Sequence, residues 1–409
     1  MKVNTANGFY LPSFFFMHIQ SKESIETLIE NNESTFIHEF LHFLQDITLS
    51  YCIREALVKN RYFELIIDDT QNRKEIKRPF NNWDDDSILT KKQTRYTWGE
   101  PKFFNFDGKI TKIEKDYFTT YTTANIYKYK LFLDNGDTYF MGASDLLEYI
   151  AHKIENKFYE TEHPTFPYKA VDLLFDYYEL SDVSTKIKLY FVEFALHNDS
   201  PLNQLIQSIE MFLIKQPLIF KSEKLCKELL VNIQWKSKGG FEETISSKTE
   251  RRLNDFKNSF SNLFQQYHFA DIQMWIDDII IYSRKNFFGK LIFAELYSLS
   301  RNEFNEYLTK ILNDIGVPLI FNDNSECITL LPMKYDSDIF LQFYVNNTFM
   351  EYISTVDKKC PVYQYCNSVN YNIIDKHCIT NPVIRAKDDN LCPFALLLKS
   401  YGLEDIKWK

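Results

Sequence analysis

The spacing of apolar residues predicts a chain built mainly from helices. Residues 21–31 carry apolar side chains three and four positions apart, and a longer helix is predicted from residues 32–34 to about Lys59, with no proline or glycine to break it. Residues 8–18 and 61–67 are instead rich in aromatic and β-branched residues, which favours strands. The first part of the chain therefore combines both kinds of element.

Residues 80–141 have a different pattern. Aromatic and β-branched residues alternate with polar ones, and the turn-forming dipeptides Asp107-Gly108 and Asn135-Gly136 interrupt them. This alternation predicts a β-rich insertion of several antiparallel strands.

Helical periodicity returns after the insertion. A helix is predicted to begin at a Ser144 cap, and residues 170–315 are predicted to be mostly helical. Residues 327–345 are predicted to form a short hairpin, which is followed by a helix and a cysteine-rich tail. The whole pattern predicts an α+β fold, rich in helices, with three regions: residues 1–168, 169–320 and 321–409.

Composition narrows the possible classes of protein. With 409 residues, 45% of them hydrophobic and 16% aromatic, the chain is not a disordered one. A net charge of −9 argues against a nucleic-acid-binding protein, and no run of 18 apolar residues predicts a membrane span. The odd count of seven cysteines, without a recognisable signal peptide, favours a reducing compartment, so we expect a cytoplasmic protein.

A narrow polar stripe crosses the apolar helix predicted at residues 35–46 (TFIHEFLHFLQD). Apolar residues cover every other direction of this helix. A solvated helix face usually carries Lys or Arg, yet none occurs between Glu33 and Tyr51. The stripe is therefore predicted to face a functional site. Its members are Thr35, His38, Glu39, His42, Gln45 and Asp46.

Three residues of this stripe spell H-E-x-x-H. His38 and His42 lie one turn apart on the same helix face, so both imidazoles can bind one zinc ion at roughly 2.0–2.1 Å. Zinc lowers the pKa of a bound water to about 7, and Glu39 is placed to remove its proton as general base. This is the chemistry of metal-assisted hydrolysis.

The motif resembles the active-site helix of the zincin metallopeptidases. The extension typical of metzincins is absent, because His42 is followed by FLQDITLSYC and not by a glycine and a third histidine. The resemblance covers this helix and one later segment only. It implies a zincin-like core, one catalytic Zn²⁺ and, as in gluzincins, a third metal ligand that is a glutamate on a later helix.

Glu148, in GASDLLEYIAHKIE, is the preferred third ligand. Ala151 would allow this helix to pack closely against the motif helix, and the β-rich insertion would account for the long separation of 148 − 42 = 106 residues. The alternative is an ordinary exposed polar stripe. That stripe would consist of Asp145, Glu148, His152 and Glu155.

Two other glutamates are weaker candidates for the third ligand. Glu55 would lie roughly 20 Å beyond His42 if the motif helix is unbroken, which excludes it. Glu64 is placed on a predicted strand and has no supporting pattern.

Further residues are predicted to support the site. Asp46, one turn beyond His42, is expected to hydrogen-bond a histidine ring. His152 is expected either to support the metal ligands or to polarise a substrate carbonyl. Tyr168 and His163, both in the segment HPTFPY, are candidates for stabilising charge that develops in the transition state.

Four cysteines cluster in the last fifty residues. Their spacing, C-x5-C-x11-C-x13-C, lacks the C-x2-C pairs that typify structural zinc sites. A second, structural zinc ion and a group of simply buried thiols are therefore equally consistent with the sequence. The residues concerned are Cys360, Cys366, Cys378 and Cys392.

The favoured function is zinc-dependent hydrolysis of peptide bonds in a protein or peptide substrate. One alternative is a catalytically inactive zincin-fold scaffold whose helical region binds a protein partner. Another is an effector protease that is secreted and delivered into another cell. A zinc deaminase is disfavoured because the paired H-x-E and P-C-x-x-C motifs of that class are absent.

Overall fold

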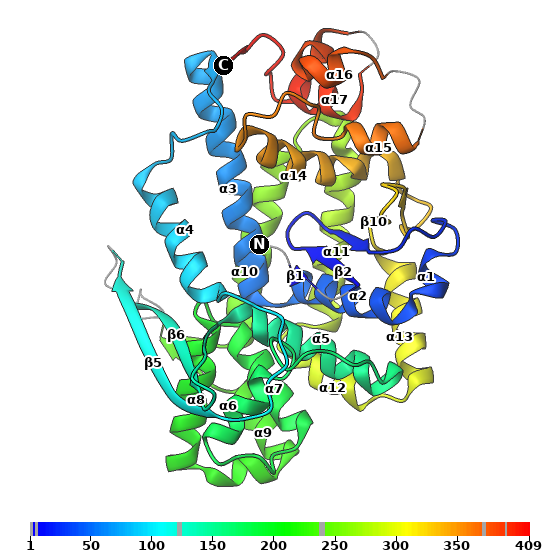
Figure 1. The fold of residues 1–409 in the computed structure, drawn as a ribbon. Helices are drawn as coiled ribbons and strands as arrows, with labels where there is room; N and C mark the ends of the chain where they lie inside the picture. The colour runs from blue at the N-terminus through cyan, green and yellow to red at the C-terminus, as the bar shows by residue number, and fades with distance from the viewer. Residues whose placement is uncertain (1–2, 5–6, 121–124, 237–241, 370–373, 389–390) are drawn as a thin grey trace.

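The computed structural model describes residues 1–409 except 1–2, 5–6, 121–124, 237–241, 370–373 and 389–390. Helices form most of the molecule, and small sheets lie between and beside them (Figure 1). The predicted α+β class is therefore confirmed. No helix in the described part of the chain has the length and apolar character needed to cross a membrane.

Two successive helices form the centre of the fold. The predicted continuous helix ends at Leu49, which adopts an extended conformation (φ −88°, ψ 127°), so the chain forms α2 (Glu33–Thr48) and α3 (Ser50–Arg73). The strand predicted at 61–67 is wrong, because this stretch is part of α3. Phe63, Ile66, Ile67 and Thr70 are buried at helical spacing, so tertiary packing overrides the β propensity of the individual residues.

A five-stranded sheet covers α2. Its order is β1-β2-β3-β10-β11, with β3 and β10 parallel and the other pairs antiparallel. The predicted strand at 8–18 is in fact two strands joined by a turn, and only Leu28–Asn31 of the helix predicted at 21–31 is helical (α1). The strands are β1 (Val3–Asn4), β2 (Gly8–Leu11), β3 (Phe16–Ile19), β10 (Leu319–Phe321) and β11 (Cys327–Ile328).

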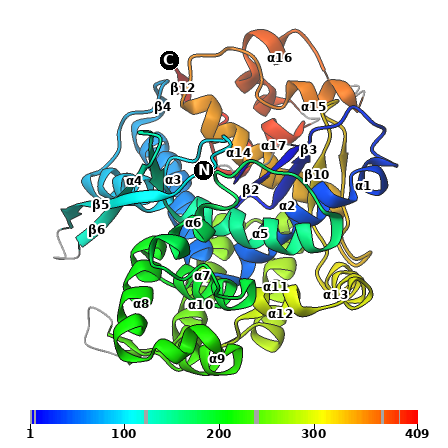
Figure 2. The same cartoon turned by 60° about the horizontal axis from the view of Figure 1, so that its bottom comes forward.

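The opposite face of this sheet packs against α14 (Leu341–Ile353). The Tyr344 ring lies 5.4 Å from that of Phe16 and 4.6 Å from that of Phe321. Figure 2 shows β2, β3 and β10 between α2 and α14. Strands from the two ends of the chain thus complete one layered core.

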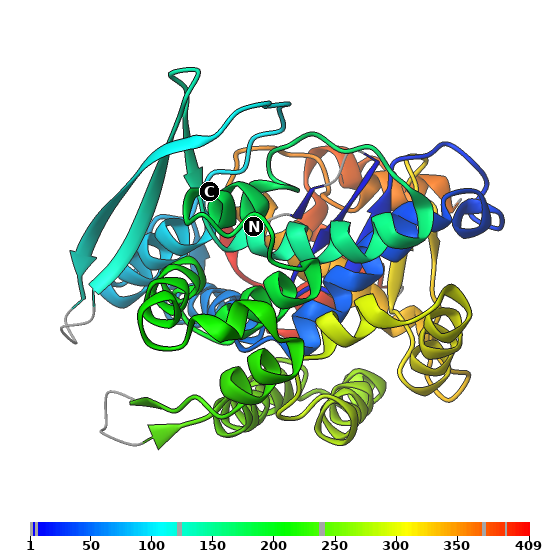
Figure 3. The same cartoon turned by 90° about the horizontal axis from the view of Figure 1, so that it is seen from below.

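The insertion begins with a helix and continues as a three-stranded sheet. The turn predicted at Asn135-Gly136 joins β6 to β7, and Gly136 has a positive φ of 91° there. Asp107-Gly108 precedes β5 and forms no hairpin, which differs from the prediction. The hairpin of β5 and β6 extends away from the body (Figures 1 and 3). The elements are α4 (Asp85–Trp98), β5 (Ile110–Thr119), β6 (Asn125–Leu133) and β7 (Thr138–Met141).

The region from residue 170 to 315 is mostly helical, as predicted. Helix α7 lies at its centre, in contact with α5 (Ala143–Tyr159), α8, α9 and α12. The helices are α6 (Ala170–Tyr177), α7 (Thr185–Leu196), α8 (Pro201–Lys215), α9 (Glu223–Val231), α10 (Ile245–Leu263), α11 (Ala270–Asn286), α12 (Ile292–Ser298) and α13 (Arg301–Asp314). A short hairpin of β8 (Trp235–Lys236) and β9 (Glu242–Glu243) precedes α10.

The C-terminal part returns to the N-terminal part. The hairpin predicted at 327–345 is wrong, because β11 pairs back with β10 and the later residues begin α14. The last strand, β12 (Lys407–Trp408), pairs with β4 (Glu75–Ile76) after α3. Between α14 and β12 the chain forms α15 (Tyr363–Ser368), α16 (His377–Thr380) and α17 (Pro393–Ser400). One continuous apolar core joins the three predicted regions.

Candidate metal centre

Helices α2 and α5 lie side by side and carry the candidate site (Figures 1 and 2). Near the start of α2, the Ser34 hydroxyl donates a hydrogen bond to Glu155, late in α5 (2.5 Å). Near the end of α2, the Gln45 side chain donates to the carbonyl of Leu147, early in α5 (2.9 Å). The two helices therefore run antiparallel. Ala151 on α5 is fully buried, as expected for a residue that permits close packing.

The start of α5 is set by a close backbone approach. A Cβ on Gly142 would lie 2.3 Å from the carbonyl carbon of Trp98, so no larger residue fits between α4 and α5. The helix is capped by Gly142 and Asp145, whose carboxylate accepts from the Gly142 N–H at 2.8 Å, and not by Ser144 as predicted. The Ser144 hydroxyl instead donates to the Trp98 carbonyl (2.8 Å). These contacts fix which side of α5 faces α2.

The three predicted ligands converge between the helices. The Glu148 Oε2 atom lies 3.1 Å from His38 Nε2 and 3.6 Å from His42 Nε2. One donor atom from each residue lies within 4.8 Å of the other two. Ligands at the usual bond lengths around tetrahedral zinc are separated by about 3.3 Å. The spacing and the N,N,O donor set therefore fit a zinc ion.

The ligand atoms are withdrawn from solvent. His38, His42 and Glu148 are each at most 2% exposed. His42 Nε2 is buried and has no hydrogen-bond partner in the described part of the chain. A buried nitrogen without a partner costs free energy, and a cation at this position would remove that cost.

The far nitrogens of both imidazoles are held by side chains that sequence reasoning did not assign to this role. His38 Nδ1 lies 2.7 Å from Glu155 Oε2, and His42 Nδ1 lies 2.7 Å from Gln45 Oε1. If each Nδ1–H donates to its oxygen when a metal ion is bound, each Nε2 lone pair is left to bind the ion. The signals were present in the sequence, since Gln45 belongs to the polar stripe and Glu155 lies two turns after Glu148.

Asp46 does not have its predicted partner. Its carboxylate accepts hydrogen bonds from the Tyr10 hydroxyl (3.0 Å) and from the Ser13 N–H (2.6 Å). It therefore fastens α2 to the turn between β2 and β3 and does not orient a histidine. Burial raises the pKa of Asp46 to about 6.

The electrostatics of the site favour a positive charge. Burial alone would lower the pKa of His38, but its hydrogen bonds to Glu148 and Glu155 outweigh burial and raise this pKa to about 10. Burial would likewise raise the pKa of Glu148, and the neighbouring imidazoles of His38 and His42 lower it instead. A proton on His38 thus serves as the counter-charge that a metal ion would otherwise supply.

Glu39 lies against the sheet. It is fully buried, and its Oε1 would be 3.0 Å from a Cβ placed on Gly8, the first residue of β2. The same Cβ would lie 2.7 Å from the His18 carbonyl oxygen. Glycine at position 8 therefore allows the strand to approach the predicted general base.

The structure brings His152, His163 and Tyr168 together beside His38. The Tyr168 ring lies 4.5 Å from His163, 5.3 Å from His152 and 6.1 Å from His38. Burial lowers the pKa of His152 to about 3, so its ring is neutral. His163 Nε2 lies 3.2 Å from Glu155 and completes a second potential metal-binding group with His38 and Glu155.

The weaker ligand candidates lie elsewhere. Glu55 contacts Arg54 at 2.9 Å and the Thr94 hydroxyl at 3.1 Å, and Glu64 lies 3.8 Å from Arg61. Neither belongs to a potential metal-binding group among the described residues.

The cysteine cluster remains a prediction. Its four thiols are buried and unbridged, and Cys360 N–H donates to the Cys378 carbonyl (2.7 Å). Burial and the neighbouring thiols raise the pKa of Cys360. Within the described residues, no three of these sulfur atoms lie within 4.8 Å of one another.

Comparison of this chain with family models, with curated proteins and with solved structures finds no match. Only the residues of the site themselves therefore indicate a function.

Proposed function

We propose that this protein is a zinc-dependent peptidase with a zincin-like core, in which His38, His42 and Glu148 hold the ion. The observation that carries the proposal is their convergence. The Nε2 atoms of His38 and His42 lie 3.1 and 3.6 Å from Oε2 of Glu148, which is 148 − 42 = 106 residues after His42, and these separations support a tetrahedral site. The unpartnered His42 Nε2 supports the same assignment.

Each neighbouring side chain has a role in the proposed reaction. When bound, zinc supplies a Lewis acid that lowers the pKa of a water molecule to about 7. Glu39 accepts the proton of the attacking water and delivers it to the departing amine. Glu155 and Gln45 hold the two imidazoles in the orientation that ligation requires.

In this proposal, Tyr168 and neutral His152, whose rings lie 5.3 Å apart, donate hydrogen bonds to the carbonyl oxygen of the scissile bond as its charge grows. A neutral hydrogen-bond donor suits a buried site, because burying a charged donor would cost free energy. These two roles depend on the proposed peptidase activity.

The test compares the wild type with Glu39→Gln. Both proteins, loaded with zinc, are incubated with a peptide mixture derived from a proteome, and new termini are identified by mass spectrometry. Both should hold one equivalent of zinc at this site, and cleavage should be lost only in the variant. Equal cleavage by the two proteins would refute the role of Glu39, and absence of stoichiometric zinc in the wild type would refute the metal centre.

A scaffold function is the second candidate, because the site is closed. His38, Glu39, His42 and Glu148 are all at most 2% exposed, so a peptide backbone needs an opening to reach them. A zinc-loaded wild type that cleaves nothing in the mixture would favour the scaffold.

A further inference from the structure

A polar cavity of about 350 Å³ adjoins the candidate metal centre. It lies where the beginning of α2 meets the end of α5, and Ser34 and Glu155 form part of its wall. His38 belongs both to this wall and to the potential metal-binding group. An occupant of the cavity would therefore lie beside His38, on the side of Glu155. The volume is within the range of pockets that hold small ligands.

The wall of the cavity is anionic. Glu33, Glu155 and Glu162 contribute carboxylates, and hydroxyl, amide and imidazole groups supply the rest, with no Lys, Arg or aliphatic residue among the described lining. At the exposed rim, Arg301 lies 3.2 Å from Glu33. No ion pair or hydrogen bond within the described part of the chain engages the carboxylate of Glu162. The cavity therefore favours a positively charged group.

Two residues of the lining, His163 and Thr161, have buried polar atoms without a hydrogen-bond partner in the described part of the chain. The His163 side chain is 7% exposed, and its Nδ1 has no hydrogen-bond partner in the parts of the chain that the structure describes. Nε2 of the same ring lies 3.2 Å from Glu155 Oε2, and with the ring proton on Nε2 the Nδ1 atom is an acceptor. The Thr161 Oγ1 atom is also buried without a partner. Both atoms could accept an N–H from an occupant.

We propose that this cavity receives the Arg or Lys side chain of the substrate residue next to the scissile bond. The proposal rests on the peptidase function proposed above and names its substrate class: polypeptides with a basic residue at one position beside the cleaved bond. A guanidinium group carries five N–H donors and a positive charge, which matches acceptors and carboxylates together.

A second metal ion is the competing occupant, since His38, Glu155 and His163 form a potential metal-binding group. The Nδ1 atom of His38 is already engaged with Glu155 at 2.7 Å. Binding a second ion there would require His38 to bridge two cations through both nitrogens. The geometry therefore favours an organic cation.

Binding is tested without requiring cleavage. Zinc-loaded Glu39→Gln protein is titrated with N-acetyl-arginine amide and with its neutral analogue N-acetyl-citrulline amide, followed by NMR. The arginine compound should bind more tightly, and adding Glu162→Gln should weaken it roughly three- to tenfold. Glu160→Gln is the matched control, since Glu160 is exposed, two residues away and outside the cavity wall. Equal affinity for both compounds, or displacement of arginine by a second equivalent of zinc, would overturn the proposal.

Cleavage provides the second arm. Peptides cut by the zinc-loaded wild type should show Lys or Arg enriched at one position beside the cleaved bond, and Glu162→Gln should reduce this enrichment while Glu160→Gln should not. Cleavage without basic enrichment would refute the cavity assignment and leave the peptidase intact. Selective arginine binding without any cleavage would refute the peptidase and retain the cation site.

Discussion

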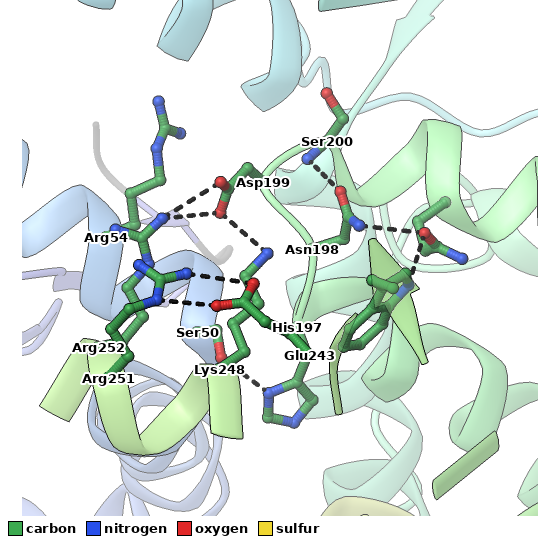
Figure 4. Close-up of polar contacts among 12 residues, drawn as sticks. Ser50, Arg54, His197, Asn198, Asp199, Ser200, Glu243, Lys248, Arg251 and Arg252 are labelled. Atoms are coloured by element: carbon green, nitrogen blue, oxygen red, sulfur yellow. Dashed lines mark hydrogen bonds and ion pairs between the residues drawn. The ribbon is translucent and has the colours of Figure 1, made fainter. Parts of the chain in front are cut away.

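Two polar clusters in this molecule compensate charge in different ways. In the first, between α2 and α5, the carboxylates of Glu148 and Glu155 contact imidazoles and the Ser34 hydroxyl. In the second, where α3 and α10 meet the turn between α7 and α8, Asp199 lies 3.3 Å from Lys248 and 3.2 Å from Arg252 (Figure 4). The second cluster carries its own permanent cations. The first has none in contact with its carboxylates among the described residues.

Each cluster also contains a buried histidine, and the pKa values of these two histidines are shifted in opposite directions. His197 Nδ1 lies 3.2 Å from the Ser50 hydroxyl, and no carboxylate of the described residues forms an ion pair with this ring, so burial lowers its pKa to about 3. His38 lies between two carboxylates, which raise its pKa to about 10 despite burial. The second cluster is complete as folded, whereas the first requires a proton or a metal ion. This incompleteness distinguishes a candidate site from a structural ion network.

The largest expected effect concerns zinc and stability. Zinc at a thousand times its dissociation constant should raise the free energy of unfolding of the wild type by about 4 kcal/mol. Glu148→Ala should lose this increment, because two imidazoles alone bind zinc weakly. Urea denaturation with and without zinc measures it, with Glu64→Ala and Asp199→Ala as controls that keep the increment. An undiminished increment in Glu148→Ala at the same submicromolar free zinc would place the third ligand elsewhere.

The next effect concerns the side chain that orients His38. Glu155→Gln removes the negative acceptor of the Nδ1–H bond, so zinc affinity should fall about 10–100-fold. Competition with a chelating dye measures the dissociation constant. Glu160→Gln makes the same charge change on an exposed residue and should leave affinity unchanged. If both variants bind zinc as the wild type does, Glu155 has no role in the metal centre.

In the second cluster, Asp199→Ala should leave Lys248 and Arg252 without their shared partner. The side chain of Asp199 is 38% exposed, and solvent screens the pair, so the loss in free energy of unfolding should be about 1–2 kcal/mol. This loss should be the same with and without zinc. A loss that depends on zinc would show that the two clusters are coupled, and would contradict the view that the second cluster is independent of the metal centre.

The smallest effect is a change in pH dependence at His197. Its folded-state pKa, about 3, lies below the ordinary value of 6.5, so the unfolded chain binds the extra proton and stability falls as pH decreases from about 6.5 toward 3. His197→Asn should reduce the slope of stability against pH by about 1.4 kcal/mol per pH unit between pH 5.5 and 4.5. Denaturation of both proteins at these two pH values measures the difference. An unchanged slope would show that His197 is not buried as a neutral ring.

Much of the candidate site could be predicted from sequence because its signals are local. The spacing of His38 and His42 is fixed by helix geometry, and the apolar surroundings of the stripe indicate burial. Glu148 could be selected because Ala151 on the same helix permits close packing. Predictions based on propensity alone did worse: residues 61–67 were expected to be a strand and are part of α3.

The sequence by itself determined the helical motif, the helix face on which its residues lie, and the residue types that suit zinc. Only the tertiary structure decided which polar side chain hydrogen-bonds which atom of the site. Asp46 and Gln45 are adjacent in the stripe, yet Gln45 faces α5 and holds His42, whereas Asp46 faces the turn after β2. The physical reason is that adjacent helical side chains point about 100° apart, so each meets a different packed element. Only the crossing of α2, α5 and the sheet determines which element that is.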